Sequence, residues 1–258
     1  MTITFYKYQG TGNDFIMIDN RHGGFPKTDN QLISFLCDRR FGVGADGLIL
    51  LEEDNSSDFS MVYYNSDGNP GSMCGNGGRC IVAFAQFLGI ITEKAEFNAV
   101  DGLHIATIDN EIISLQMQNV TDIMPKPNCL FLDTGSPHHV QMVSDLEGFN
   151  VFEEGAKLRY GIYGKGGSNI NFVEQTSEND FAVRTYERGV ENETMSCGTG
   201  VTAVALGMHY WGKTKSEKVN ISTKGGNLSI TFKKGSGGYE NIWLDGPAKQ
   251  VFKGTIAI

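Results

Sequence analysis

Two cysteines stand in similar glycine-rich strings, and a cysteine can take up or release a proton near neutral pH. Cys74 lies in MCGNGGRC (Met73–Cys80) and Cys197 lies in SCGTGVTA (Ser196–Ala203). A cysteine thiol has a pKa of about 8.5, which falls at a helix N-terminus or beside a cation. A thiolate and a thiol can therefore coexist, one as base and one as acid. Inverting a carbon that bears hydrogen needs such a pair, with one group on each face.

The residues after each cysteine suit a substrate carboxylate. Backbone N–H groups at a helix start bind anions with the help of the helix dipole, and glycine permits close approach. Such N–H groups would also stabilise the charge that develops when an α-proton leaves. Four residues are placed for this role: Gly75, Asn76, Gly198 and Thr199.

A constant offset relates the two cysteine strings. Cys197 lies 123 residues after Cys74 (197 − 74). Two further glycine pairs share this offset: Gly12 with Gly135, and Gly102 with Gly225. Three landmarks at one offset indicate an internal repeat, which fixes the architecture. We therefore predict two halves of similar fold, 1–120 and 121–258, and leave open whether the last few residues return to the first half.

Each half carries the pattern of a sheet around one central helix. Arg79–Leu88 and Val201–Tyr210 are apolar on all sides and end near Gly89 and Gly212, which is typical of buried helices. We expect each helix to begin one or two turns after the Cys-Gly-x-Gly turn. Lys157–Ser168 is expected to be a mobile Gly-rich loop. The predicted strands are Ile3–Tyr8, Asp14–Ile18, Gly102–Ile108, Ile112–Met117, Leu228–Phe232 and Ile242–Leu244.

Composition excludes several classes of protein. The chain has 258 residues, a net charge of −9 and 40% hydrophobic residues. An acidic chain is a poor match for nucleic acid or an anionic membrane surface. No apolar run approaches the roughly 18–20 residues of a membrane span, and the N-terminus lacks a signal-peptide pattern. We expect a cytoplasmic enzyme with reduced thiols, since the five cysteines are an odd number.

Other interpretations of the cysteines remain open. A single cysteine is more often a small buried hydrophobe than a catalytic group, and Cys37, Cys80 and Cys129 are expected to lie in the core. A zinc site could be imagined from four residues, but the C-x2-C and H-x3-H spacings of most zinc sites are absent. Those four residues are Cys74, Cys80, His138 and His139. CGNGGR also lacks the G-x4-G-K-[ST] spacing of a phosphate loop.

Several strings together resemble the diaminopimelate epimerase family, from Phe5 to about Gly254. They are GTGNDF (Gly10–Phe15), RRFGVGADGLILL (Arg39–Leu51), NSDGNPGSMCGNGGRC (Asn65–Cys80), TGSPHHV (Thr134–Val140), SNINFV (Ser168–Val173) and VRTYERGVENETMSCGTG (Val183–Gly200). The resemblance implies an α/β (α+β) fold of two pseudo-symmetric halves, each a mostly antiparallel sheet around a central helix. It also implies an isomerase that needs no pyridoxal phosphate or other cofactor and no metal. Such an enzyme interconverts LL- and meso-diaminopimelate for lysine and peptidoglycan synthesis, and it is often a homodimer.

The resemblance also assigns site residues. Cys74 and Cys197 match the two catalytic cysteines, and the four residues after them match the carboxylate-binding turns. Arg188 suits a bidentate grip on the distal carboxylate, and His138 matches a histidine near the site. The implied substrate contacts are Asn13, Asn65, Asn169, Glu187 and Arg188.

The chain departs from many relatives in three places. Ser136 stands where they have asparagine, Gly47 stands where some have glutamine, and Gly189–Met195 is one residue longer. These departures bear on substrate binding and leave the two-cysteine chemistry untouched.

Two other functions compete with this one. The chain could be a racemase or epimerase for proline, hydroxyproline or histidine, substrates that lack the distal carboxylate. It could also be a catalytically inactive amino-acid-binding protein, in which one cysteine is merely structural. If the two thiols approach within disulfide reach, a Cα separation of about 4.4–6.8 Å, oxidation should inactivate the enzyme and dithiothreitol should restore it.

Overall fold

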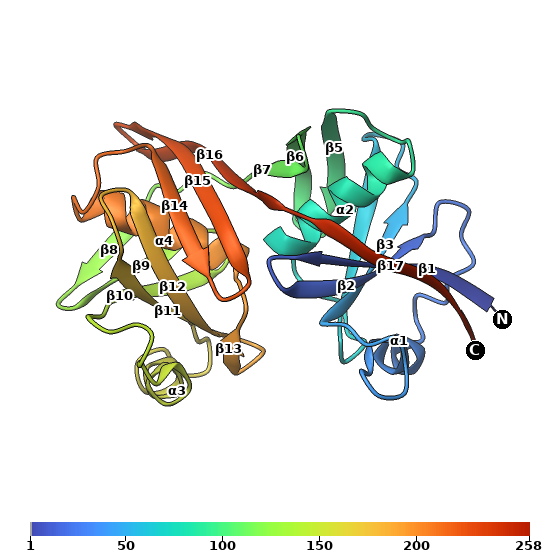
Figure 1. Ribbon diagram of the computed structural model, residues 1–258, viewed down its shortest axis with the longest axis horizontal. Helices are drawn as coiled ribbons and strands as arrows, with labels where there is room; N and C mark the ends of the chain where they lie inside the picture. Colours follow the sequence, from blue (N-terminus) through green and yellow to red (C-terminus); the bar gives the residue numbers. More distant parts are fainter. Residues whose placement is uncertain (1) are drawn as a thin grey trace. The chain divides into compact units, whose positions relative to one another are not determined.

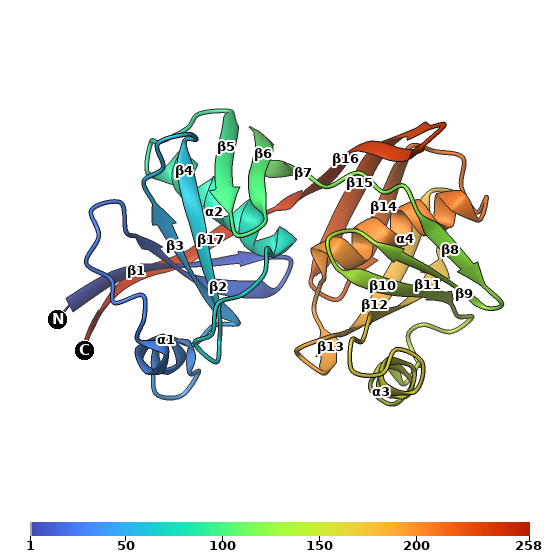
Figure 2. The same ribbon diagram turned by 180° about the vertical axis from the view of Figure 1, so that it is seen from behind.

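The computed structural model describes residues 2–258, which divide into two compact units. The first unit comprises the chain up to Leu115 together with Pro247–Ile258, and the second comprises Gln116–Gly246. Each unit has one long helix enclosed by strands and one shorter helix outside them (Figures 1 and 2).

In the first unit, neighbouring strands follow the order β17–β1–β2–β3–β4–β5–β6–β7. The pairs β2–β3 and β4–β5 are parallel, and the other pairs are antiparallel. The strands are β1 (Thr2–Gly10), β2 (Asn13–Asp19), β3 (Gly47–Glu52), β4 (Phe59–Asn65), β5 (Lys94–Ala99), β6 (Gly102–Asp109), β7 (Ile112–Gln116) and β17 (Lys249–Ala257).

In the second unit, the order is β8–β9–β10–β11–β12–β14–β15–β16, with the short β13 paired to β12. Here β10–β11 and β12–β14 are the parallel pairs. The strands are β8 (Ile123–Lys126), β9 (Cys129–Asp133), β10 (Pro137–Met142), β11 (Asn169–Gln175), β12 (Asp180–Glu187), β13 (Asn192–Thr194), β14 (Lys218–Thr223), β15 (Gly226–Gly235) and β16 (Gly238–Pro247).

The two units therefore repeat one pattern of strand pairing. Read from β17 or from β8, the pairs run antiparallel, antiparallel, parallel, antiparallel, parallel, antiparallel, antiparallel. In the first unit β17, from the end of the chain, takes the place that β8 has in the second. The predicted α/β fold of two pseudo-symmetric halves is confirmed.

The central helices begin earlier than predicted. Helix α2 (Gly75–Phe87) starts directly after Cys74, and α4 (Gly198–Tyr210) starts directly after Cys197. The expected gap of one or two turns is wrong, because the glycines form the first helical turns. Close packing explains this: a Cβ on Gly77 would lie 3.0 Å from an Ile49 methyl group. Contact with the sheet outweighs the poor helix propensity of glycine.

The glycines predicted to end these helices do so in the same way. Gly89 and Gly212 have φ values of 74° and 68°, a left-handed conformation that glycine adopts without strain. The N–H of Gly89 donates to Gln86, and that of Gly212 donates to His209. Both helix ends are Schellman motifs, since the next residue of each also donates back to the third-last helical carbonyl.

Both faces of the central strands are covered, so these strands are apolar throughout. In the first unit, α1 (Asn30–Cys37) packs with Ile16, Ile18, Leu48 and Leu50. The alternate residues point to the opposite face, where Ile49 contacts the start of α2. In the second unit, α3 (Val151–Gly161) packs on β11 and β12 in the same manner.

Helix α3 corrects the prediction of a mobile loop over Lys157–Ser168. Residues up to Gly161 are helical. Asn150 caps the helix by accepting a hydrogen bond from the N–H of Glu153, and buried Arg159 bonds to the carbonyl of Gly164. The Asn150 cap and the hydrogen bond of Arg159 stabilise this helix. The glycines of the segment had suggested a loop instead.

Candidate active site

The predicted acid/base residues occupy the same structural position in their units. Cys74 is the N-cap residue of α2, with φ −117° and ψ 120°, and Cys197 is the N-cap residue of α4, with φ −127° and ψ 113°. Cys74 is half-buried, and Cys197 is 9% exposed. The repeat thus places each thiol at the positive end of a helix dipole, which favours negative charge.

The two cysteine helices differ from the other two helices at their N-termini. In α1 and α3, the side chains of Asp29 and Asn150 accept hydrogen bonds from first-turn N–H groups. Within residues 2–258, neither Cys74 nor Cys197 makes such a capping bond. Because first-turn N–H groups have no intrahelical partner, α2 and α4 are suited to a ligand carboxylate. Gly75, Asn76, Gly198 and Thr199 are the first two residues of these helices.

In the first unit, the structure brings together Cys74, Asn13 and Asn76. The Cys74 thiol donates to Asn13 Oδ1 at 3.6 Å, and Asn76 Nδ2 donates to the same oxygen at 3.3 Å. Asn13 Nδ2 donates to Asp46 Oδ2 at 2.7 Å. At the other end, Arg79 donates to Asn76 Oδ1 at 3.0 Å. Asp46 and Arg79 were not among the predicted site residues.

A cluster of charged side chains holds Asp46 in place. The Arg39 guanidinium donates to Asp46 at 2.7 Å and to Asp14 at 2.6 Å. Lys7 also pairs with Asp14, at 2.7 Å. Burial alone would raise the pKa of Asp14, but the hydrogen bonds from Arg39 and Lys7 outweigh it and hold that pKa well below its usual range. The string GVGAD (Gly42–Asp46) is a sequence signal for this cluster, because it ends at Asp46.

Asn65 lies at the exposed end of β4, opposite Gly47 in the β3–β4 pair. Tyr63, on the same face of β4, explains the departure at Gly47. A Cβ on Gly47 would lie 2.5 Å from the Tyr63 ring, and one on Gly71 would lie 2.4 Å from it. The ring therefore fills the space that a side chain at position 47 would need. The spacing of these residues in the sequence does not show that the Tyr63 ring lies against Gly47 and Gly71; only the structure does.

In the second unit, Cys197 lies beside a hydroxyl group rather than an amide. Its sulfur is 3.5 Å from Thr199 Oγ1, and either atom could donate. The Thr134 hydroxyl donates to the Thr199 carbonyl at 2.8 Å. Space around the sulfur is limited, because a Cβ on Gly200 would lie 3.3 Å from Cys197 Sγ and 2.6 Å from Asn171 Oδ1. Glycine at position 200 is therefore needed for the local packing of the cysteine.

Three further predicted residues form one hydrogen-bonded group in this unit. Asn169 Nδ2 donates to Ser136 Oγ at 2.9 Å, and the backbone N–H of Arg188 donates to Asn169 Oδ1 at 2.9 Å. The Arg188 guanidinium lies 3.3 Å from Ser136 Oγ and is exposed. Glu187 accepts a hydrogen bond from Thr194. An exposed arginine held beside a serine and an asparagine can bind a carboxylate.

His138 is fully buried on β10. Burial, together with the charge of Arg188, lowers the pKa of His138 to about 3, so the ring is neutral at neutral pH. Asn171 Nδ2 lies 3.1 Å from His138 Nδ1 and also donates to the His139 carbonyl. Since an amide N–H donates, Nδ1 is the acceptor and the proton lies on Nε2. His138 Nε2 has no hydrogen-bond partner among the described residues.

The other three cysteines lie in the core, as expected. Cys37, Cys80 and Cys129 are 3%, 0% and 6% exposed. Burial raises the pKa of Cys37 to about 12 and raises the pKa values of Cys80 and Cys129. These three thiols are unsuited to proton transfer at neutral pH.

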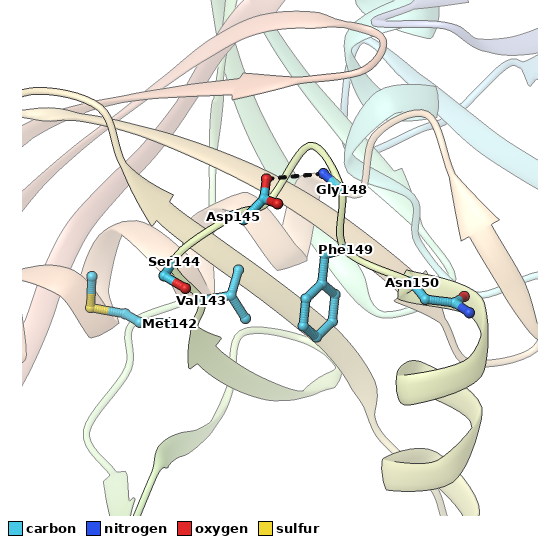
Figure 3. Close-up of a pocket in the computed structure, with 7 residues that line it drawn as sticks. All are labelled: Met142, Val143, Ser144, Asp145, Gly148, Phe149 and Asn150. Atoms are coloured by element: carbon cyan, nitrogen blue, oxygen red, sulfur yellow. Dashed lines mark hydrogen bonds between the residues drawn. The ribbon is translucent and has the colours of Figure 1, made fainter.

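Across residues 2–258, no cluster of three or more His, Cys, Asp or Glu side chains is placed to hold a metal ion. Over the same residues, no helix is long and apolar enough to span a membrane. A surface pocket of about 670 Å³ is lined by the segment that connects β10 to α3 (Figure 3). None of the predicted site residues is among those that line it: Met142, Val143, Ser144, Asp145, Gly148, Phe149 and Asn150.

Sequence comparisons point to one family. The family model described as Diaminopimelate epimerase matches residues 5–120 and 130–249. A diaminopimelate epimerase of Flavobacterium psychrophilum is 61% identical over 253 residues, covering 97% of this chain and 99% of that protein. One from Chlorobaculum tepidum is 42% identical over 260 residues, covering 96% of this chain and 99% of that protein.

Solved structures share the fold at low sequence identity. A Bacillus anthracis phenazine biosynthesis protein of the PhzF family has a TM-score of 0.81 at 14% identity, with both chains fully covered. A probable proline racemase from Agrobacterium radiobacter K84 has a TM-score of 0.72 at 15% identity, over 99% of this chain and 93% of that one. At these identities the likeness concerns the fold alone.

Proposed function

The chain belongs to the diaminopimelate epimerase family, and from that premise we propose that it interconverts LL- and meso-diaminopimelate with Cys74 and Cys197 as its two acid/base groups. The observation that carries this proposal is the equivalence of the two cysteines. Each is the N-cap residue of the central helix of its unit, at the same backbone conformation. The enzyme is an isomerase.

In the proposed reaction, one cysteine acts as thiolate and the other as thiol. The thiolate removes the α-hydrogen as a proton, and the electron pair of that C–H bond passes into the α-carboxylate as an enediolate. The thiol then donates its proton to the opposite face of the carbon. The stereocentre is inverted, the first cysteine ends as the thiol, and the second ends as the thiolate. No electrons are gained or lost, so the reaction consumes no oxidant or reductant.

The helix N-termini are proposed to stabilise the enediolate. N–H groups of Gly75 and Asn76 in one unit, and of Gly198 and Thr199 in the other, would donate to the α-carboxylate. Negative charge grows on this carboxylate as the proton leaves, and fixed N–H donors stabilise such charge without reorganisation. The lack of a cysteine capping bond at either helix, within the described part of the chain, supports this role.

The distal end of the substrate is assigned to other predicted contact residues. Arg188 would pair with the distal carboxylate, with Asn169 and Ser136 beside it. Asn65 and Glu187 are the proposed partners for the distal amino group and the remaining polar atoms. Proline and hydroxyproline have no distal carboxylate, so the exposed guanidinium favours diaminopimelate over those substrates.

NMR in D2O tests the reaction. We expect incubation with LL-diaminopimelate to replace the α-proton by deuterium and to form the meso isomer. Proline, hydroxyproline and histidine serve as comparison substrates, and exchange of one of these instead would contradict the proposal. We expect added pyridoxal phosphate or a chelator to leave the rate unchanged.

The proposed setting is the cytoplasm, where the product would serve lysine and peptidoglycan synthesis. We also propose a homodimer, on the strength of the family resemblance. Light scattering coupled to size-exclusion chromatography tests this, because a homodimer should have about twice the 28.2 kDa mass of one chain.

A further inference from the structure

We propose that Asp46 and Arg79 are positioning residues that fix the direction of two amides and thereby present a hydrogen-bond acceptor to the Cys74 thiol. The inference deepens the proposed function, because it concerns how one of the two acid/base cysteines is held. It depends on hydrogen-bond direction within the first unit, where Asn13, Asp46, Cys74 and Arg79 all lie.

Asp46 fixes the first amide. Its Oδ1 accepts from Arg39 at 2.7 Å, and its Oδ2 accepts from Asn13 Nδ2 at 2.7 Å. An ionised carboxylate only accepts, so Asn13 must turn its NH2 group toward Asp46. The Asn13 carbonyl oxygen then points the other way, toward Cys74 and Asn76.

Arg79 fixes the second amide from the opposite end. It is fully buried, and its guanidinium donates to Asn76 Oδ1 at 3.0 Å and to Thr11 Oγ1 at 3.2 Å. A guanidinium only donates, so Asn76 must turn its carbonyl toward Arg79 and its NH2 group toward Asn13. The chain of hydrogen bonds therefore runs in one direction, from Arg79 through Asn76 and Asn13 to Asp46.

This direction has a consequence for Cys74. The sulfur lies 3.6 Å from Asn13 Oδ1, an atom that can only accept. A protonated thiol can donate to that oxygen, whereas a thiolate would face it without a hydrogen bond. Hydrogen bonding to the neutral form disfavours the charged form. Asn13, held by Asp46 and Asn76, should therefore raise the pH at which Cys74 becomes a thiolate.

Charged and titratable groups around Cys74 act in opposing directions. Arg79 on α2, Lys7 on β1 and Arg39 are cations, and Asp14 on β2 and Asp46 are anions. Cys80 on α2 is a buried thiol whose pKa is raised, and burial likewise raises the pKa of Tyr8 on β1. Because Asp46 also carries charge, its test needs a control that removes the same charge and leaves the amide chain intact.

Asp14 provides that control. It belongs to the same charged cluster as Asp46, through Arg39. It differs from Asp46 because the Asn13 amide donates to Asp46. Asp14→Asn and Asp46→Asn each remove one negative charge, but Asp46→Asn alone removes the carboxylate that holds the Asn13 amide in its orientation.

Iodoacetamide alkylation at a series of pH values, followed by mass spectrometry of the Cys74 peptide, tests the proposal on the full chain. Only the thiolate reacts. We expect Asp46→Asn to lower the midpoint pH for Cys74 by about one unit, with a smaller shift for Asp14→Asn. Asp46→Glu should restore the wild-type midpoint, and circular dichroism should show that each variant folds. The Cys197 peptide gives an internal reference that should not shift.

An unchanged midpoint in folded Asp46→Asn would overturn the proposal, and so would an equal shift in Asp14→Asn. A merely structural Asp46 would lower activity without moving the midpoint. Asp46→Ser gives a second variant if Asp46→Asn does not fold. Because alkylation needs no turnover, this result stands apart from the epimerase assay, and either proposal can fail alone.

Discussion

Cys74 and Cys197 occupy the same place in two similar units, but the side chains beside them differ in kind. The offset that relates the cysteines also relates their neighbours: Asn13 with Ser136, Asp46 with Asn169, and Asn76 with Thr199. The first two pairs share one hydrogen bond. Asn13 donates to Asp46 in the first unit, and in the second unit the equivalent of Asp46, Asn169, donates to the equivalent of Asn13, Ser136. The donor has moved from one position to the other.

The difference shows how a duplicated fold can divide its work. Around Cys74, charged groups at both ends fix the direction of two amides. Around Cys197, the neighbour is the Thr199 hydroxyl, which can donate or accept. The backbone keeps both thiols at helix N-termini, while the side chains make the two sites unequal. Two unequal thiols suit a reaction that needs one acid and one base at a time.

The largest expected effect comes from removing either cysteine. Cys74→Ala and Cys197→Ala should each lower kcat by about 10³-fold, since general acid/base groups contribute about 10²–10⁴-fold. Steady-state assays with both stereoisomers measure the loss. Cys129→Ala, which removes a core thiol, is the matched control and should keep near-normal turnover. Normal turnover in Cys74→Ala or in Cys197→Ala would contradict the claim that both cysteines act as acid/base groups.

The next effect concerns Arg188, an exposed cation whose equivalent in the first unit, 123 residues earlier, is the neutral Asn65. Arg188→Ala should lower kcat/KM for diaminopimelate by about 100-fold, because a lost charged hydrogen bond costs roughly 1.5–3 kcal/mol. Arg40→Ala, at another exposed arginine, is the control and should change little. If Arg188→Ala acts no more strongly than Arg40→Ala, the distal carboxylate is bound elsewhere.

A smaller effect distinguishes two equivalent glycines. A Cβ on Gly200 would meet Asn171 Oδ1 at 2.6 Å and Cys197 Sγ at 3.3 Å, whereas one on Gly77 would meet flexible ends of Ile49 and Met61 at 3.0 and 3.2 Å. Gly200→Ala should therefore reduce kcat by about tenfold through a displaced thiol, and Gly77→Ala should reduce it less, because flexible side-chain ends can give way. Assays and melting temperatures of the pair check this, and equal losses would argue against it.

A fourth prediction concerns stability in acid rather than activity. The pKa of buried His138 is lowered to about 3, so below its unfolded value of about 6.5 the unfolded chain binds the extra proton. Stability should fall as pH drops from about 6.5 toward 3, by at most about 1.4 kcal/mol per pH unit. Urea unfolding of wild type and His138→Gln should show a shallower slope in the variant. Parallel slopes would assign the acid loss to carboxylates.

The sequence predicted the features that repeat. Cys74, Cys197 and the glycines that end α2 and α4 lie in equivalent positions, because one offset connects them. The strand runs Ile3–Tyr8 and Asp14–Ile18 lie within β1 and β2, since an apolar strand bounded by a tight turn leaves a strong local pattern.

What the sequence could not predict depends on contacts between distant residues. The early helix starts follow from glycines packed on a sheet, as at Gly77 against Ile49. The hydrogen-bonded chain Arg79–Asn76–Asn13–Asp46 joins three separate segments of the sequence. In the sequence alone, nothing distinguishes Arg79 from any other basic residue within an apolar segment. The contact between Tyr63 and Gly47 could not be predicted either, because neither residue alone indicates that the Tyr63 ring occupies the space of a side chain at position 47.

The most direct test of the central claim is the location of deuterium at early conversion in D2O, measured in both reaction directions. If two cysteines act from opposite faces, the base keeps the substrate proton while the acid delivers a deuteron from solvent. We therefore predict deuterium at the inverted carbon of the product and almost none in the recovered substrate, whichever stereoisomer is supplied. Product that retains the substrate hydrogen, or substrate that gains deuterium as fast as product forms, would contradict a division of acid and base between Cys74 and Cys197.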